Sequence, residues 1–254
     1  MIGLGPPPLW LPPKPAIVRA GRIERAPLPV EAVLPGLAPV LARRAVGNAI
    51  TTITFVASAG ANAATITIPA GAQAGDVAVL FDLAHSTSVA AAPTSVTPAN
   101  WTLIKETNEA VSRGSRAITS YKILAAGEPG SSVTGMNDDR EDKVMLVFRG
   151  NVAVVTVTPS VWNGESTDGD PASQSVAASG GAAPLVVLGC AGDDNSNASF
   201  ATASPAFDGT GTATDLDAIM GYKIYNSAPA DHTIDMADLG SNNALHSGYL
   251  QFSA

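Results

Sequence analysis

The sequence contains little cysteine, few charged residues and few aromatic residues. Its single cysteine, Cys190, excludes a disulfide framework within the chain. Because Cys190 ends an apolar run, we expect a small buried hydrophobic side chain there rather than a reactive thiol. Charged residues make up only 14% of the chain, beside 24 glycines and 19 prolines, which leaves scant material for long helices.

Motifs that mark common catalytic and cofactor sites are also missing. No G-x-S-x-G, H-E-x-x-H, phosphate-loop or C-x-x-C pattern occurs. The three histidines, His85, His232 and His246, lack acidic or cysteine neighbours at the spacing of metal ligands. The sequence therefore predicts no catalytic residue, no metal ligand and no cofactor. A pair of carboxylates from distant loops, as in glycoside hydrolases, would leave no such motif and stays open as an alternative.

Basic residues are scarce, and long apolar runs are absent. The chain has 14 Lys and Arg against 22 Asp and Glu, a net charge of -8 and a pI near 4.7, so the body lacks the basic footprint that grips nucleic acid or an anionic membrane. No stretch approaches the roughly twenty apolar residues of a spanning helix. Prolines interrupt the first thirty residues, where a secretory signal needs a continuous apolar region. We expect synthesis in the cytoplasm without a signal peptide, and neither nucleic acid nor membrane as a partner.

Prolines and charged residues are unevenly distributed along the chain. Residues 1–47 hold ten of the 19 prolines and six of the 14 basic residues but only two acids, which leaves residues 48–254 with eight basic and twenty acidic residues. Proline fixes φ and has no backbone donor, so residues 6–15 predict an extended, polyproline-like path. The pattern indicates a basic extended arm, 1–47, before an acidic body, 48–254.

An arm of this composition has no core of its own. It is either a disordered tail or a tether that is ordered by a neighbouring protein surface. Apolar anchors with basic residues among them favour the tether. The arm residues predicted to contact the partner are Leu9, Trp10, Lys14, Ile17, Val18, Arg19, Arg22 and Arg25.

The body contains a nine-residue sequence that occurs twice in similar form. Residues 116–124 read Arg-Ala-Ile-Thr-Ser-Tyr-Lys-Ile-Leu, and residues 217–225 read Asp-Ala-Ile-Met-Gly-Tyr-Lys-Ile-Tyr. Both copies alternate apolar and polar residues, as half-buried strands do. The repeat predicts two halves, about 48–150 and 151–254, with Tyr121 and Tyr222 in equivalent places.

The neighbours of the repeated phrase also match in pairs. The apolar stretch 76–81 precedes the first copy as 184–188 precedes the second, and 143–148 follows the first as 247–252 follows the second. Such alternating stretches between turn residues predict roughly fourteen strands, about seven in each half. We expect strands near 50–56, 64–68, 76–83, 101–104, 116–124, 132–134, 143–148, 152–162, 174–178, 185–190, 198–203, 217–225, 232–236 and 245–252.

The predicted fold class is all-β. Two architectures fit: one antiparallel, jelly-roll-like β-sandwich with an internal two-fold pseudo-repeat, to which each half contributes strands in both sheets, or two small sandwiches in tandem. The junction 149–152 is too short for a flexible linker, and each half has few aromatic residues for a core of its own. We therefore favour the single sandwich.

Two further patterns have ordinary explanations. Acidic residues gather in the stretches 137–142, 168–170, 193–195 and 215–217, none with the spacing of an EF-hand loop, so we interpret them as solvated hairpin tips. Trp101 and Trp162 have the chemistry to stack on a sugar ring, but a Trp at the end of an alternating strand more often packs in the core or at its rim.

Several stretches are similar to a known class of proteins. Gly75-Asp-Val-Ala-Val-Leu80, Trp101-Thr-Leu-Ile104, Tyr121-Lys-Ile123 and Val147-Phe-Arg-Gly150, in that order, resemble β-sandwich structural proteins of tailed bacteriophages, and residues 6–19 resemble the start of proteins in phage structural modules. The resemblance implies a virion component of the capsid surface, neck or tail. Its expected partners are other virion proteins and further copies of itself, in a particle assembled in the host cytoplasm. A carbohydrate-binding adhesin is the alternative.

Overall fold

Strands make up almost all of the regular structure of this chain. The computed structural model describes residues 52–85, 95–109, 114–136, 141–150, 152–167, 169–193, 197–237 and 243–253. In these ranges it contains sixteen strands, β1 to β16, and two short 3-10 turns, with every strand pair antiparallel. The predicted all-β, antiparallel fold class is confirmed.

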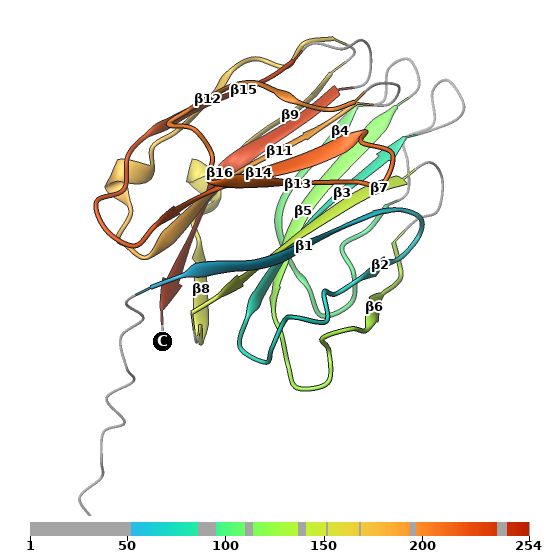
Figure 1. The fold of residues 1–254 in the computed structure, drawn as a ribbon. Coiled ribbons are helices and arrows are strands. Elements are labelled where there is room, and N and C mark those ends of the chain that lie inside the picture. The colour runs from blue at the N-terminus through green and yellow to red at the C-terminus, as the bar shows by residue number, and fades with distance from the viewer. Residues whose placement is uncertain are drawn as a thin grey trace, which may run out of the picture. The chain divides into compact units, whose positions relative to one another are not determined.

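The first half of the body forms one large sheet and one small sheet (Figure 1). The first large sheet has five strands in the order β1-β7-β3-β5-β4, and the first small sheet pairs β2 with β6. The bounds are β1 Thr54–Asn62, β2 Ile66–Thr67, β3 Val77–His85, β4 Thr102–Glu109, β5 Ser115–Ile123, β6 Ser132–Val133 and β7 Glu141–Arg149.

The second half is built in the same way. The second large sheet runs β13-β14-β11-β16-β8, with β9 also paired to β16, and the second small sheet runs β10-β15-β12. The bounds are β8 Val154–Val157, η1 Pro159–Val161, β9 Asn163–Thr167, β10 Gln174–Val176, η2 Ala178–Gly180, β11 Leu185–Gly192, β12 Phe200–Ser204, β13 Gly209–Thr212, β14 Ala218–Tyr225, β15 His232–Met236 and β16 Asn243–Ser253.

The strand order of the first half returns in the second. The large sheets correspond strand for strand: β1 to β8 and β9, β7 to β16, β3 to β11, β5 to β14 and β4 to β13. The small-sheet pairs β2-β6 and β10-β15 also correspond. Tyr121 pairs with Val79 on β3, and Tyr222 pairs with Leu188 on β11, so the two tyrosines occupy the equivalent places expected of the repeat.

The register corrects one detail of the predicted repeat. Val77 pairs with Phe148 in the first half, and the equivalent Val186 pairs with Leu250 in the second. Phe148 therefore matches Leu250 rather than Phe252, a shift of two residues. Side chains alternate with a period of two, so this shift preserves the buried face and leaves no trace in the sequence pattern.

The two large sheets pack face to face and form the central core. β1 lies against β13, β7 against β14, β5 against β16 and β4 against β9. Phe81, Leu146 and Leu188 are among the residues of this core, and all three are fully buried. The first strand of each half thus faces an edge strand of the other, β13 for β1 and β4 for β9, and these two edge strands are equivalent in the repeat. This is the reciprocal arrangement of a two-fold related pair.

Each small sheet covers the outer face of the large sheet from its own half. Ile66 and Val133 of the first small sheet pack with Leu80 of β3, and Ile234 and Val176 of the second pack around β11. The body therefore has four layers: small, large, large and small. The favoured model, in which each half contributes strands to both sheets of one sandwich, is wrong, because no described sheet mixes strands from the two halves.

Several strand boundaries also differ from the expected ones. The expected strand 152–162 is divided into β8 and β9 by η1, which begins at Pro159, a residue without a backbone donor. β13, Gly-Thr-Gly-Thr, was not expected because it has no apolar alternation. A Cβ on Gly211 would lie 2.9 Å from Leu146 Cδ2 and 3.0 Å from Ser58 Cβ, so close packing against the first large sheet requires glycine there. In the described ranges, no helix has the length and apolar character needed to cross a bilayer.

Candidate functional site

The eight arm residues predicted to contact a partner lie outside the described residues, so their role stays a prediction. Cys190 is fully buried in the central core, and burial raises the pKa of its thiol to about 12. The expectation of a buried, unreactive cysteine is confirmed.

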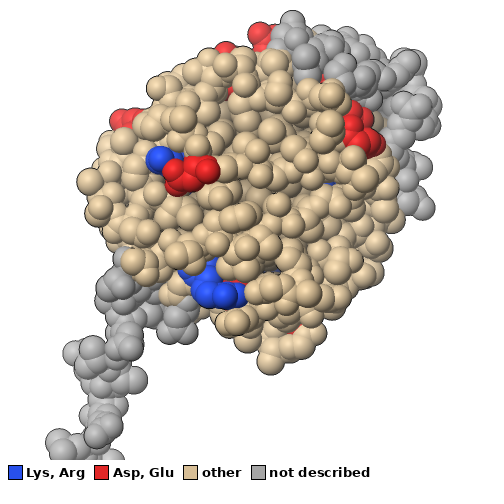
Figure 2. All heavy atoms as spheres, viewed as in Figure 1, with Lys and Arg blue, Asp and Glu red and all other residues tan. Residues whose placement is uncertain are grey.

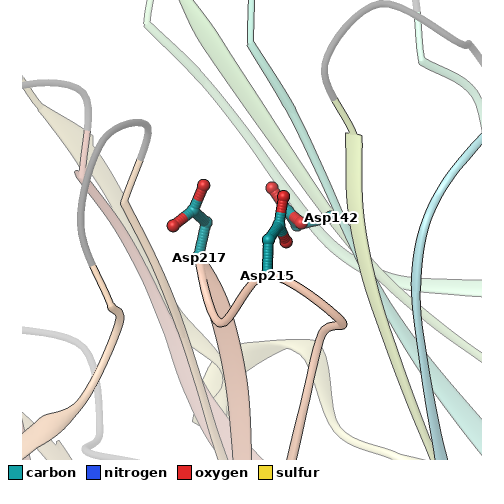
Figure 3. A group of neighbouring side chains, drawn as sticks. All are labelled: Asp142, Asp215 and Asp217. Carbon is teal, nitrogen blue, oxygen red and sulfur yellow. The ribbon is translucent and has the colours of Figure 1, made fainter.

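Three aspartates from distant parts of the chain meet at one edge of the central core (Figure 3). Asp142 lies at the start of β7, whereas Asp215 and Asp217 lie in the turn between β13 and β14. One carboxylate oxygen of each lies within 4.8 Å of the others. Asp193 N donates to the Asp217 backbone oxygen at 2.9 Å, so three of the four acidic stretches of the sequence converge here.

The fold explains this convergence. β7 faces β14 across the central core, and the alternation along β7 puts Asp142 on the same inner face as Val144 and Leu146. In the opposite turn, Ala213 N bonds to Ala218 O at 2.9 Å, and Leu216 adopts a φ of 76°. This tight turn presents the aspartates on both sides of Leu216 to β7.

Strand β1 fixes the turn from the other side. Thr214 Oγ1 donates to Gly60 O at 3.3 Å, and the side-chain amide of Asn62 donates to Asp215 Oδ2. Asn62 is also the register partner of Asp142. The cluster therefore contains side chains from both halves of the body: Asn62 and Asp142 from the first, and Asp215 and Asp217 from the second.

Asp142 differs from a solvated hairpin tip. It is only 3% exposed, so the expectation of a solvated tip is wrong for this residue. Burial raises the pKa of Asp142 to about 9; Asp215 and Asp217 add to the rise, and Lys143 opposes it. No described residue donates a hydrogen bond to Asp142 Oδ1.

The neighbouring lysine points away from the aspartate cluster. Successive residues of a strand face opposite sides, and Lys143 Nζ lies on the outer side of the sheet, 3.2 Å from Asp82 Oδ1. Ser95 Oγ donates to the other oxygen of Asp82. Asp82 and Lys143 are at most 1% exposed, so this outer ion pair is a buried packing element.

The two tryptophans of the body have different environments. Trp162 is 3% exposed, and its Nε1 donates to Tyr249 O at 3.1 Å, so it is a core residue, as expected. Trp101 is half-buried and lines a hollow of about 140 Å³ beside the ion pair of Lys122 and Glu128. Of the two, only Trp101 offers a ring edge to a ligand.

Hydrogen bonds explain the positions of His246 and His232. His246 is fully buried between the large sheets, where Nε2 bonds to Thr107 Oγ1 at 2.7 Å and Nδ1 to Thr119 Oγ1 at 2.8 Å. Burial lowers the pKa of His246 to about 3, with a smaller effect from Lys105. His232 Nε2 bonds to Tyr225 Oη at 2.9 Å. Both histidines act as neutral packing residues.

The sequence contained the acidic stretches but not the contacts between them. Asp142 and Asp215 are separated by more than seventy residues, and only the packing of one large sheet on the other brings them together. No protein-family model, curated protein or solved structure matches this chain.

Proposed function

We propose that the protein is a non-enzymatic structural component of a bacteriophage virion. In this proposal its body is a rigid block of the capsid surface, neck or tail, and its arm ties that block to neighbouring subunits. The observation that carries the proposal is the strand order of the second half. Counting β8 and β9 as one strand, the first strand lies beside the last, the last beside the third and the third beside the sixth.

In the second small sheet the second strand lies beside the seventh and the seventh beside the fourth, whereas the fifth, β13, lies beside the sixth in the second large sheet. Apart from the fifth strand, this order resembles that of a jelly roll, an architecture found in viral capsid proteins and lectins. We infer that each half is a jelly-roll-like unit, with fewer strands in the first small sheet. Two such units fused through their large sheets make a block that suits repetitive assembly.

The surface supports protein partners over nucleic acid. In the view of Figure 2, the described surface is mostly uncharged, with Lys and Arg confined to small spots. Binding to a phosphate backbone needs a continuous basic stripe. An uncharged face of this kind suits contact with other virion proteins and with further copies of the chain.

Deletion of residues 1–47 tests the role of the arm. The body carries all the described strands and forms one compact unit, Ala45–Ala254, so we expect the truncated protein to fold but to lose attachment to particles that lack it. Co-sedimentation of full-length and truncated protein with such particles measures this. Circular dichroism of the truncated protein is the folding control.

A second variant separates contact from charge. Neutralising Arg19, Arg22 and Arg25 together should weaken attachment most at low salt, because exposed charges are screened as ionic strength rises.

Attachment of the truncated protein at full-length affinity would show that the body is the docking surface and that the arm has another role.

The alternative function is a carbohydrate-binding adhesin, which the hollow beside Trp101 favours. Lectins also use jelly rolls, and a half-buried Trp ring can stack on a sugar. A glycan array tests this alternative. Glycan binding that is lost in Trp101→Ala but kept in Leu103→Ala, a change at a neighbouring exposed apolar position, would show that the protein is an adhesin. Trp162 is unsuitable for this test because it is buried.

A further inference from the structure

We propose that Asp142, Asp215 and Asp217 bind one calcium ion, which ties the two halves of the body together at the edge of the central core. The ligand atoms are carboxylate oxygens only, and such oxygens are the preferred ligands of hard divalent cations. This site is independent of any role in a virion.

The spacing of the oxygens favours calcium. Two ligands of one ion lie no farther apart than twice the metal–oxygen distance, which is about 5 Å for Ca²⁺ and about 4 Å for Mg²⁺. The three oxygens lie within 4.8 Å of one another. One Ca²⁺ can therefore reach all three after small side-chain adjustments, and its variable coordination suits a site with one buried and two more accessible ligands.

The burial of Asp142 is a second, independent observation. This side chain is 97% buried, and its Oδ1 accepts no hydrogen bond from any described residue. The hydrogen bond that its carboxyl group does make is with Asp215, another acid of the same cluster (Figure 3). A buried carboxylate oxygen without a partner is costly, and buried charges in proteins are paired or coordinate metals. Lys143 is engaged on the other side of the sheet, so a cation in the cluster would supply the missing partner.

The remaining ligands are available beside the cluster. Calcium takes about six to eight oxygens. Asn62 already places its side-chain amide against Asp215, and a rotation of that amide would turn its oxygen to the ion. Water would fill the other positions, because Asn62 and Asp215 are exposed.

The position of the site gives the ion a structural role. Asp142 belongs to β7 of the first half, and Asp215 and Asp217 flank the start of β14 in the second. β7 and β14 face each other across the central core. An ion held by both acts only in the folded state, so it stabilises that state by mass action.

Calcium titration of the full-length protein tests the proposal. After treatment with EDTA, we expect isothermal titration calorimetry to give one Ca²⁺ per chain and the melting temperature to rise with added CaCl₂. Asp215→Asn and Asp217→Asn should each weaken Ca²⁺ binding at least tenfold and remove most of the rise. Asp235→Asn, a matched charge change at a half-buried position of β15, should leave both unchanged.

The outcomes are decisive in either direction. Absence of a calcium-dependent shift in the full-length protein would overturn the proposal, as would Ca²⁺ affinity retained in both Asp215→Asn and Asp217→Asn. Equal affinity for Mg²⁺ would overturn the assignment to calcium. Asp142→Asn is the most direct variant, but it alters a buried residue. Asp215 is exposed, so Asp215→Asn tests calcium binding even if Asp142→Asn does not fold.

Discussion

At the scale of single residues, His246 shows how burial between two sheets sets a pH dependence. Its ring lies between Thr107 and Thr119, with Lys105 and the Cys190 thiol as the nearby titratable groups. The folded protein keeps the ring neutral down to about pH 3. The unfolded chain takes up a proton near pH 6.5. This residue therefore contributes stability above about pH 6.5 that is lost as the pH falls.

We expect His246 to reduce the free energy of unfolding by about 1.4 kcal/mol for each pH unit below about 6.5. Urea unfolding of the full-length protein between pH 5 and 7 measures the slope. His246→Gln should remove this contribution from the slope, because glutamine keeps polar atoms between the two threonines but does not titrate. Asp142 contributes in the opposite direction in both proteins, because its raised pKa adds stability as the pH falls. Burial also lowers the pKa of His232, so His232→Gln should change the slope in the same direction. An identical slope in the protein and in His246→Gln would contradict the assignment.

At the scale of elements, the packing of β1 on β13 depends on small residues. A Cβ on Gly60 would lie 2.0 Å from the backbone oxygen of Thr212, and no side-chain rotation relieves a contact with backbone. Gly60→Ala should therefore push the two strands apart and cost on the order of 1 to 3 kcal/mol, the range of core overpacking. Urea denaturation measures the change.

Gly71→Ala is the matched control for this prediction. Its added methyl group would have no neighbour within 4 Å, so the variant should be neutral or slightly stabilising because alanine restricts the unfolded chain. Equal effects of the two substitutions would show that β1 and β13 have room to separate. The same close approach explains why the glycine-rich β13 forms a strand without an alternating pattern.

At the scale of the whole molecule, the two halves share one core. Tyr222 of the second half stacks on Phe55 of β1, with ring centroids 4.6 Å apart, and Tyr121 of the first half directs its hydroxyl to Val155 O of β8 at 3.5 Å. The repeated tyrosine of each half thus contacts the first strand of the other. We expect neither half to keep its large sheet when the other unfolds, because each would expose the apolar inner face.

The three tryptophans allow this cooperativity to be measured, since one lies in the arm and one in each half. With Trp10 and Trp162 replaced by Phe, fluorescence reports the first half; with Trp10 and Trp101 replaced, it reports the second. In each variant the fluorescence midpoint in urea should equal the midpoint from far-UV circular dichroism. Separate midpoints would show that the halves unfold independently, as tandem sandwiches would.

Strand content and the internal repeat can be predicted from the local sequence pattern. Alternation in residues 116–124 and 217–225 fixes which side chains share a face, and the recurrence of Tyr-Lys-Ile fixes which strands are equivalent. The sequence also predicted the burial of Cys190 and Trp162 correctly. These properties depend on local periodicity and hydrophobicity, which a linear pattern records.

Which strands share a sheet and which acids share a site depends on how the layers pack. Strand β3 is buried on both faces, so its pattern does not tell which layer lies on which side. Asp142 and Asp215 look like separate solvated tips in the sequence, yet the packing of one large sheet on the other places their oxygens within 4.8 Å. Contacts between residues far apart in the chain depend on how layers stack, and local side-chain periodicity carries no record of that stacking.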